Sequence, residues 1–178
     1  MTEYAVFLRG INISGKNKIA MPHLLSALKD AGFSDVKTYL NSGNITLSSE
    51  KADTAQIHRD IEKMLPEKFG FSVPVYVIKI AVLLQILENA PSWWGLPDTE
   101  TYDNLIFILT DDTPSDICSA LGEPTEELER ISVYGSVIFW TFDRAKYQKC
   151  AWWHRTAQKG IAERLTIRTA NTLRKMLK

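Results

Sequence analysis

Apolar runs of strand length alternate with stretches of helical periodicity along the N-terminal half of the chain. The continuous apolar run Tyr4–Leu8 predicts a strand that is buried on both faces. Apolar residues recur at helical spacing over residues 21–28 and again over residues 57–65. The other predicted strands are Val36–Leu40, Ile45–Leu47 and Val73–Val77. The resulting order, strand-helix-strand-strand-helix-strand, is that of a ferredoxin-like unit.

The C-terminal half repeats this order of elements after a predicted connecting helix at Ile80–Glu88. The two halves share few identical residues, so the repeat is one of element order. The predicted elements of the second half are a strand at Asn104–Leu109, a helix at Pro114–Leu121, a hairpin of Arg130–Tyr134 with Val137–Phe142, a long helix from Lys146 to about Glu163, a short strand at Leu165–Ile167 and a final helix at Ala170–Lys178.

We therefore predict an α+β fold in which two ferredoxin-like β-α-β-β-α-β halves are packed together, with an added C-terminal helix. The predicted domains are the first half at residues 1–78 and the linker helix with the second half at residues 79–178. Strands such as Tyr4–Leu8 and Val137–Trp140 are apolar on both faces. Each of these side chains left exposed to water would lose roughly 1.5–3 kcal/mol of stabilisation by burial. We therefore expect the second faces of these strands to be covered, and the two halves to form one interlocked body.

Polar and basic residues gather at one end of the first predicted sheet. In this topology the loop after the first strand and the turn between the second and third strands lie at the same end. Arg9, Lys16 and Lys18 bring positive charge there, the glycines permit close backbone approach, and the start of the first helix favours an anion. The candidate ligand-binding residues in these segments are Arg9, Gly10, Asn12, Gly15, Lys16, Asn17, Asn41, Ser42, Gly43 and Asn44.

The same residues also suit turns, because Asn, Ser and Gly are the residues that tight turns favour. Both interpretations stay open from the sequence. The segment Gly10–Lys16 lacks the Gly-Lys-Ser/Thr ending of a Walker loop, and it does not match the dinucleotide-binding fingerprint either.

Three short motifs resemble those of a known bacterial family. They are Leu-Arg-Gly-Ile-Asn at Leu8–Asn12, Gly-Lys-Asn-Lys at Gly15–Lys18 and Asn-Ser-Gly-Asn at Asn41–Asn44. Over nearly its whole length the chain resembles the family catalogued as domain of unknown function 1697. The resemblance implies a fold of paired ferredoxin-like units, and it brings no established activity, substrate or catalytic residue.

The family's motif near the C-terminus, Thr-x-Arg-Asn-Trp-x-Thr, is only partly present in this chain. Thr166, Arg168 and Thr172 match the motif. Thr169 and Ala170 stand where the family has Asn and Trp, which weakens any role carried over to these two positions.

Arg168 ends the last predicted strand just before a helix, much as Arg9 follows the first strand. Asn171 lies in the next turn. Arg168 and Asn171 are therefore added to the candidate ligand-binding residues. The alternative is a helix cap with surface charge.

The charges of the chain are segregated although 21 basic and 21 acidic residues balance. Residues 98–129 contain ten acidic residues and no lysine or arginine. Residues 144–178 contain ten lysines and arginines and one acid, Glu163. The basic segment suits a polyanion. Alternatively, the two segments face each other in the fold or form solvated helix faces.

We predict no cofactor and no metal. Cys150 and His154 are four residues apart on a predicted helix, but two ligands do not make a zinc site. Cys118 has no assignable activating partner. No apolar stretch approaches the roughly 20 residues that span a bilayer, so we expect a cytoplasmic protein without a membrane partner, as a monomer or a homodimer.

The function we favour is a binding module for a phosphorylated ligand at the loop after the first strand and the Asn41–Asn44 hairpin. The ligand is a nucleotide or a single-stranded nucleic acid. One alternative is a protein-protein interaction protein without a small ligand, and another is an enzyme on a small phosphorylated or nucleotide substrate. The loop and the hairpin contain no Asp, Glu, His or Cys, so the sequence leaves catalytic activity undecided.

Overall fold

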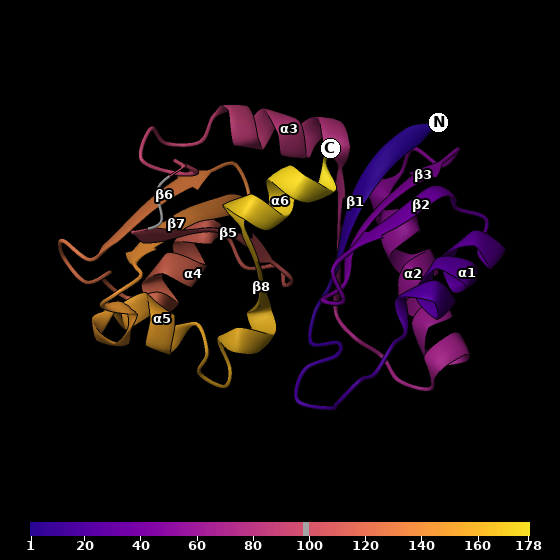
Figure 1. Ribbon diagram of the computed structural model, residues 1–178, viewed down its shortest axis with the longest axis horizontal. Helices are drawn as coiled ribbons and strands as arrows, with labels where there is room; N and C mark the ends of the chain where they lie inside the picture. Colours follow the sequence, from indigo (N-terminus) through magenta and orange to yellow (C-terminus); the bar gives the residue numbers. More distant parts are fainter. Residues whose placement is uncertain (98–99) are drawn as a thin grey trace. The chain divides into compact units, whose positions relative to one another are not determined.

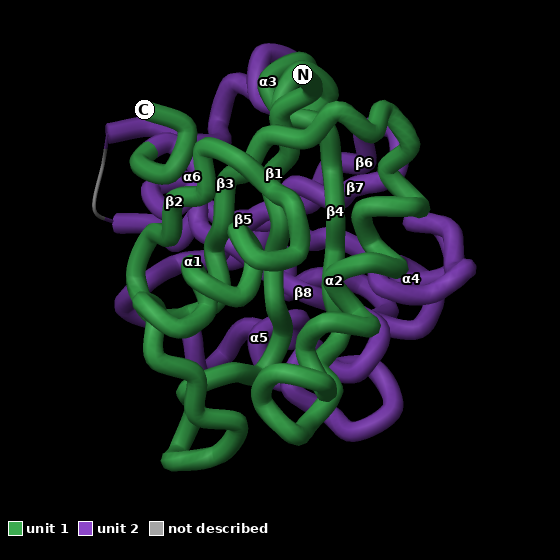
Figure 2. The backbone as a smooth tube through the Cα atoms, turned by 90° about the vertical axis from the view of Figure 1, so that its right-hand side faces the viewer, with its two compact units in different colours: residues 1–85, 175–178 green, residues 86–174 purple. Residues whose placement is uncertain are grey.

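The computed structural model of the protein describes residues 1–97 and 100–178. The described chain divides into two compact units, residues 1–85 with 175–178 and residues 86–174, which Figure 2 shows in green and purple. Each unit contains one four-stranded sheet. The division falls within the connecting helix α3 (Ile80–Glu88).

The first unit has the element order of a ferredoxin-like half. Its elements are β1 (Thr2–Leu8), α1 (Met21–Asp30), β2 (Ser34–Tyr39), β3 (Asn44–Ser49), α2 (Thr54–Phe69) and β4 (Val75–Lys79). The strands pair antiparallel in the order β2-β3-β1-β4, so β1 and β3 are central. Helices α1 and α2 lie on the same face of this sheet (Figure 1).

The second unit has the same order of elements. They are β5 (Thr101–Ile108), α4 (Pro114–Leu121), β6 (Glu129–Tyr134), β7 (Val137–Asp143), α5 (Ala151–Arg155) and β8 (Leu165–Thr169). Helix α6 (Ala170–Met176) follows, and its last two residues belong to the first unit. The strands pair antiparallel in the order β6-β7-β5-β8, which matches the order in the first unit strand for strand. The predicted α+β fold with two ferredoxin-like sheets is therefore confirmed.

The core of each unit lies between its sheet and its helices. In the first unit Tyr4, Leu28 and Ile61 come from β1, α1 and α2 and are fully buried. In the second unit Ile106 and Trp152 are buried in the same way. Strands β1 and β7 are buried at consecutive residues, as their continuous apolar runs predicted. Among the described helices, none combines the length and the hydropathy that crossing a membrane requires.

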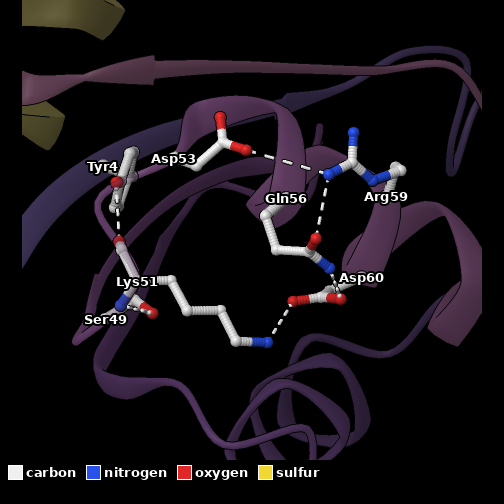
Figure 3. A network of polar contacts seen from close by, with 7 residues as sticks. All are labelled: Tyr4, Ser49, Lys51, Asp53, Gln56, Arg59 and Asp60. Carbon is white, nitrogen blue, oxygen red and sulfur yellow. Dashed lines mark hydrogen bonds and ion pairs between the residues drawn. The ribbon is translucent and has the colours of Figure 1, made fainter.

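A network of polar side chains anchors the start of α2 to β1 (Figure 3). Asp53 caps the helix with its carboxylate. Lys51 Nζ lies 2.6 Å from one oxygen of Asp60, and Gln56 donates to the other at 2.8 Å. The Tyr4 hydroxyl donates to the Lys51 carbonyl oxygen at 2.8 Å. Burial raises the pKa of Asp60, but the hydrogen bonds from Lys51 and Gln56 outweigh burial and hold that pKa below its ordinary value.

The long helix predicted over residues 146–163 is wrong. Only α5 and two short 3-10 helices form there, at Tyr147–Lys149 and Ala162–Arg164. The break before α5 has a physical cause, because side chains distant in sequence accept hydrogen bonds from its first two amides. The Thr125 hydroxyl accepts a hydrogen bond from the Ala151 amide at 2.8 Å. The buried Glu129 carboxylate accepts one from the Trp152 amide at 3.1 Å.

An ion pair joins the acidic segment 98–129 to the basic segment 144–178. Arg164 Nε and Nη2 donate to the two carboxylate oxygens of Asp112 at 2.8 and 2.6 Å. Such a two-pronged bond is the strong form of an arginine-carboxylate contact. The hydrogen bonds from Arg164 and Thr110 hold the pKa of the Asp112 carboxyl below its ordinary value.

Replacing Gly43 with Ala is expected to destabilise the first unit by about 3 kcal/mol. Gly43 has a φ of +82°, and a Cβ atom there would lie 2.7 Å from Leu8 Cβ, so left-handed strain adds to overpacking. Gly135 at the β6–β7 turn also has a positive φ, of +54°, but no atom lies within 4 Å of its added Cβ. Gly135→Ala is therefore the control, with an expected loss of about 1 kcal/mol in urea unfolding. Equal losses would contradict the role of the Leu8 contact.

Acidification is expected to cost the wild-type protein more stability than it costs the Asp112→Asn variant. The pKa of an unfolded aspartate is about 3.9. When the pKa in the folded state is lower, the aspartate stabilises the fold at pH values above about 3.9, and this stabilisation is lost as the pH falls through the folded-state pKa. The wild-type free energy of unfolding should therefore fall more steeply below about pH 4 in chemical denaturation. Asp111→Asn removes the neighbouring exposed carboxylate and should keep the wild-type slope. The same slope for wild type and Asp112→Asn would refute this account.

Candidate functional site

Asparagine side chains hold the loop between β1 and α1 in a fixed shape. The side-chain nitrogen of Asn12 donates hydrogen bonds to the backbone carbonyl oxygens of Ile19 at 2.9 Å and Asn41 at 2.8 Å. The side-chain oxygen of Asn12 accepts a hydrogen bond from the backbone amide of Ile19 at 2.8 Å. Asn17 donates to the Gly10 carbonyl oxygen at 3.1 Å. Because the bond to Asn41 crosses to the β2–β3 turn, the structure brings the two candidate segments together. Loop residues with positive φ are Gly10, Asn12, Ser14, Gly15 and Asn17.

The turn between β2 and β3 packs against the end of β1. The Gly43 carbonyl oxygen accepts a hydrogen bond from the Leu8 amide at 2.8 Å. Asn44 is fully buried, and its amide nitrogen donates to the Tyr39 carbonyl oxygen at 3.1 Å and to the Ser42 hydroxyl at 2.9 Å. Tight turn chemistry therefore accounts for Ser42, Gly43 and Asn44.

Positive charge is the other feature of the β1–α1 loop. Lys16 and Lys18 are exposed, and Arg9 is partly buried. Lys18 lines a hollow of about 420 Å³ together with Asn12, Asn41 and the start of α1. None of the described residues that line this hollow is acidic. The described lining of the hollow therefore carries a net positive charge from Lys18.

Helix α1 begins at the wall of this hollow without a side-chain cap. The N-cap residue is Ala20, which has no side-chain hydrogen bond to offer, and no acidic residue occupies the first turn. Pro22 removes one backbone donor, and the other amides of the first turn have no partner within the helix. These amides carry the positive end of the helix dipole, which favours an anion.

The candidate residues of the first unit divide into two groups. Asn12, Gly15 and Asn41 line the hollow. The others lie in the same loop and turn outside its lining and are Arg9, Gly10, Lys16, Asn17, Ser42, Gly43 and Asn44. Sequence reasoning missed Ile19 and Met21, which form an apolar wall of the hollow, because apolar residues at the start of a helix predict core packing.

Arg168 and Asn171 belong to the second unit. Arg168 is the last residue but one of β8, and its Nη1 donates to the Thr166 hydroxyl at 2.9 Å and to the Ile167 carbonyl oxygen at 2.8 Å. Burial lowers the pKa of Arg168 to about 10. Asn171 is exposed in α6 and lines a second cavity, of about 440 Å³, which Arg168 does not line.

Neither cysteine lies in the environment of an activated thiol. Burial raises the pKa of both Cys118 and Cys150, which keeps the thiols protonated at neutral pH. Within residues 1–97 and 100–178, no three His, Cys, Asp or Glu side chains are grouped so that they could hold a metal ion.

The fold and the site define a class of protein, one built from two ferredoxin-like units with a basic loop beside a small hollow. The chain belongs to the family described as "Protein of unknown function (DUF1697)", whose family model matches residues 1–139. The membership predicted from the sequence is therefore confirmed, and the C-terminal motif at residues 166–172 lies outside the matched residues.

A solved structure shows the same fold over nearly the whole chain. The conserved bacterial protein SP0830 from Streptococcus pneumoniae is 28% identical with a TM-score of 0.86, and 99% of each chain is covered. An unknown protein from Galdieria sulphuraria is 14% identical with a TM-score of 0.28, over 94% of this chain and 96% of that chain, and so weak a likeness carries no argument. No curated protein matches the chain.

Replacing Asn12 with Ala is expected to destabilise the protein by about 2–3 kcal/mol, because its side chain makes three hydrogen bonds within the chain. Asn17→Ala is the matched control, since Asn17 also has a positive φ but makes one bond from an exposed position. We expect a loss of about 1 kcal/mol there. The measurement is urea unfolding, and equal losses for the two variants would show that Asn12 does not hold the loop.

Proposed function

We propose that this protein binds a small phosphate-bearing ligand in the hollow between the β1–α1 loop and the start of α1. The observation that carries the proposal is the charge of the lining. Lys18 lies there beside a helix start that has no side-chain cap, and no described lining residue is acidic.

Two sources of positive potential meet at this hollow. Lys18 contributes a full charge, and the start of α1 contributes about half a charge. Because the N-cap residue Ala20 provides no side-chain acceptor, the first amides of α1 are left for water or a ligand. A phosphate group accepts several such hydrogen bonds at once. Arg9 and Lys16 add positive charge from the same loop.

The size of the hollow favours a small molecule. Its volume of about 420 Å³ falls within the range of about 300–1,000 Å³ that small-molecule sites occupy. Ile19 and Met21 offer an apolar wall to the part of the ligand that carries no charge. A nucleic-acid strand binds instead through aromatic side chains that stack on successive bases. None of the described lining residues is aromatic, so we favour a ligand of mononucleotide size.

The expected affinity is moderate. Each charge-assisted hydrogen bond contributes roughly 1.5–3 kcal/mol, and we expect a bound phosphate group to accept two or three of them. After the costs of association, this corresponds to dissociation constants on the order of millimolar to micromolar.

The test is thermal unfolding at low salt with nucleotides, sugar phosphates, inorganic phosphate and short single-stranded RNA and DNA. A ligand present at about 100 times its dissociation constant stabilises the folded protein by about 2.7 kcal/mol, which raises the melting temperature measurably. Lys18→Ala should abolish most of this rise, because it removes the cation of the lining. Lys63→Ala removes an exposed lysine of α2 and should leave the rise unchanged.

The proposal would be supported if small phosphates raise the melting temperature of the wild-type protein and of Lys63→Ala but not that of Lys18→Ala. A rise with RNA or DNA alone would overturn the assignment to a small ligand. No rise with any compound would reject the site and leave protein-protein interaction as the function to pursue.

A further inference from the structure

A cavity of about 440 Å³ in the second unit brings together two arginines that lie far apart in the sequence. Arg144 follows β7, and Arg174 lies in α6, which continues directly from β8 (Figure 1). Strand β5 pairs antiparallel with both β7 and β8. The start of β5 therefore lies at the same end of the sheet as the ends of β7 and β8, and the cavity is at that end.

Arg144 is held by an aromatic ring. Its guanidinium carbon lies 4.0 Å from the ring centroid of Tyr102. The Tyr102 ring in turn packs against Phe142, its partner across the β5–β7 pair, with the ring centroids 5.4 Å apart. A guanidinium stacked in this way keeps its N–H groups available around its edge. The stack therefore orders Arg144 without using its donors.

Arg174 is held by the backbone of residue 95. Its Nη2 donates to the Gly95 carbonyl oxygen, and the Gly95 amide donates to Asp103 Oδ2 at 2.8 Å. Gly95 has a φ of +74°, and a Cβ atom there would lie 2.5 Å from Arg174 Nη2. A side chain at position 95 would therefore displace the guanidinium group of Arg174 from the Gly95 carbonyl oxygen.

The lining of this cavity carries an excess of positive charge. Asp103 is the carboxylate among its described residues, and it already accepts hydrogen bonds from the Gly95 amide at 2.8 Å and the Thr141 hydroxyl at 2.7 Å. Within the part of the chain that the structure describes, no carboxylate forms an ion pair with Arg144 or Arg174. The lining therefore offers two guanidinium groups to an anion from outside.

We propose that this cavity is a binding site for a phosphate monoester, held by the side chains of Arg144, Arg174 and Asn171. One guanidinium fork already satisfies the two oxygens of a carboxylate. A phosphate monoester has three terminal oxygens and a charge of about −1.5 to −2, which matches two guanidinium groups. Leu96 and Pro97 give the organic part of the ligand an apolar wall. The site is separate from the hollow beside α1 and does not depend on it.

The experiment titrates the protein with phenyl phosphate and, separately, with benzoate. Nuclear magnetic resonance follows the Nε–H signals of Arg144 and Arg174, and calorimetry gives the affinity. We expect saturable shifts of both arginine signals with phenyl phosphate and weaker binding of benzoate, which lacks the third oxygen and the second charge.

Arg144→Gln and Arg174→Gln should each weaken the binding of phenyl phosphate about 10-fold or more, since each removes charge-assisted hydrogen bonds. Arg144→Lys keeps the charge but loses the planar fork, so it should restore only part of the affinity. Arg130→Gln removes an exposed arginine of β6 outside the lining and should leave the affinity unchanged. Lys18→Ala should also leave it unchanged, which separates this site from the hollow of the first unit.

Unchanged affinity in both glutamine variants would overturn the proposal. Benzoate binding as tight as that of phenyl phosphate would overturn the assignment to phosphate. Melting temperatures establish that each variant is folded. If Arg174→Gln fails to fold, Tyr102→Leu carries the test in its place, because it removes the ring that orders Arg144 and should weaken binding while leaving the charge intact.

Discussion

Burial of the central strands on both faces is the constraint on which each unit depends. Strand β1 exposes at most 1% of each residue from Tyr4 to Leu8, so it must lie inside the sheet, between β3 and β4. Its pairing sets Val6 opposite Ile45 on one side and opposite Val77 on the other. This register decides where β1 ends, and it therefore places the β1–α1 loop beside the turn that follows β2. Strand pairing therefore sets the end of the sheet at which the hollow forms, and residues of the loop line it.

The polar residues of the loop stabilise the chain and shape the site at the same time. Asn12 uses its donors and its acceptor on the backbone of Ile19 and Asn41, and the buried Asn44 binds within its own turn. These contacts leave the positive charge of Lys18 and the first amides of α1 as the groups suited to an anion. For the proposed ligand, a framework of amides that is already ordered lowers the entropic cost of binding.

The two units place cations in different ways although their sheets have the same strand order. In the first unit the lysine that lines the hollow lies on an exposed loop, and its compact ammonium group rotates freely. In the second unit Arg144 is stacked on Tyr102, and Arg174 is bonded to the backbone of Gly95. Orientation of the planar guanidinium groups before binding favours a ligand with matching oxygen geometry. The two proposed sites therefore lie at opposite ends of equivalent strands, β1 in the first unit and β5 in the second.

The sequence by itself determined the order of strands and helices in both units, because apolar periodicity depends on residues close together in the chain. It also determined that the basic loop and the Asn41–Asn44 turn share one end of the sheet. The helix predicted from the sequence over residues 146–163 was wrong, because the side chains of Thr125 and Glu129 accept hydrogen bonds from backbone amides in this segment. Only the tertiary structure decided that the loop asparagines donate to backbone carbonyl oxygens of the first unit and that Arg144 and Arg174 line one cavity. Such contacts join residues distant in sequence, and their partners are set by strand pairing and packing rather than by local pattern.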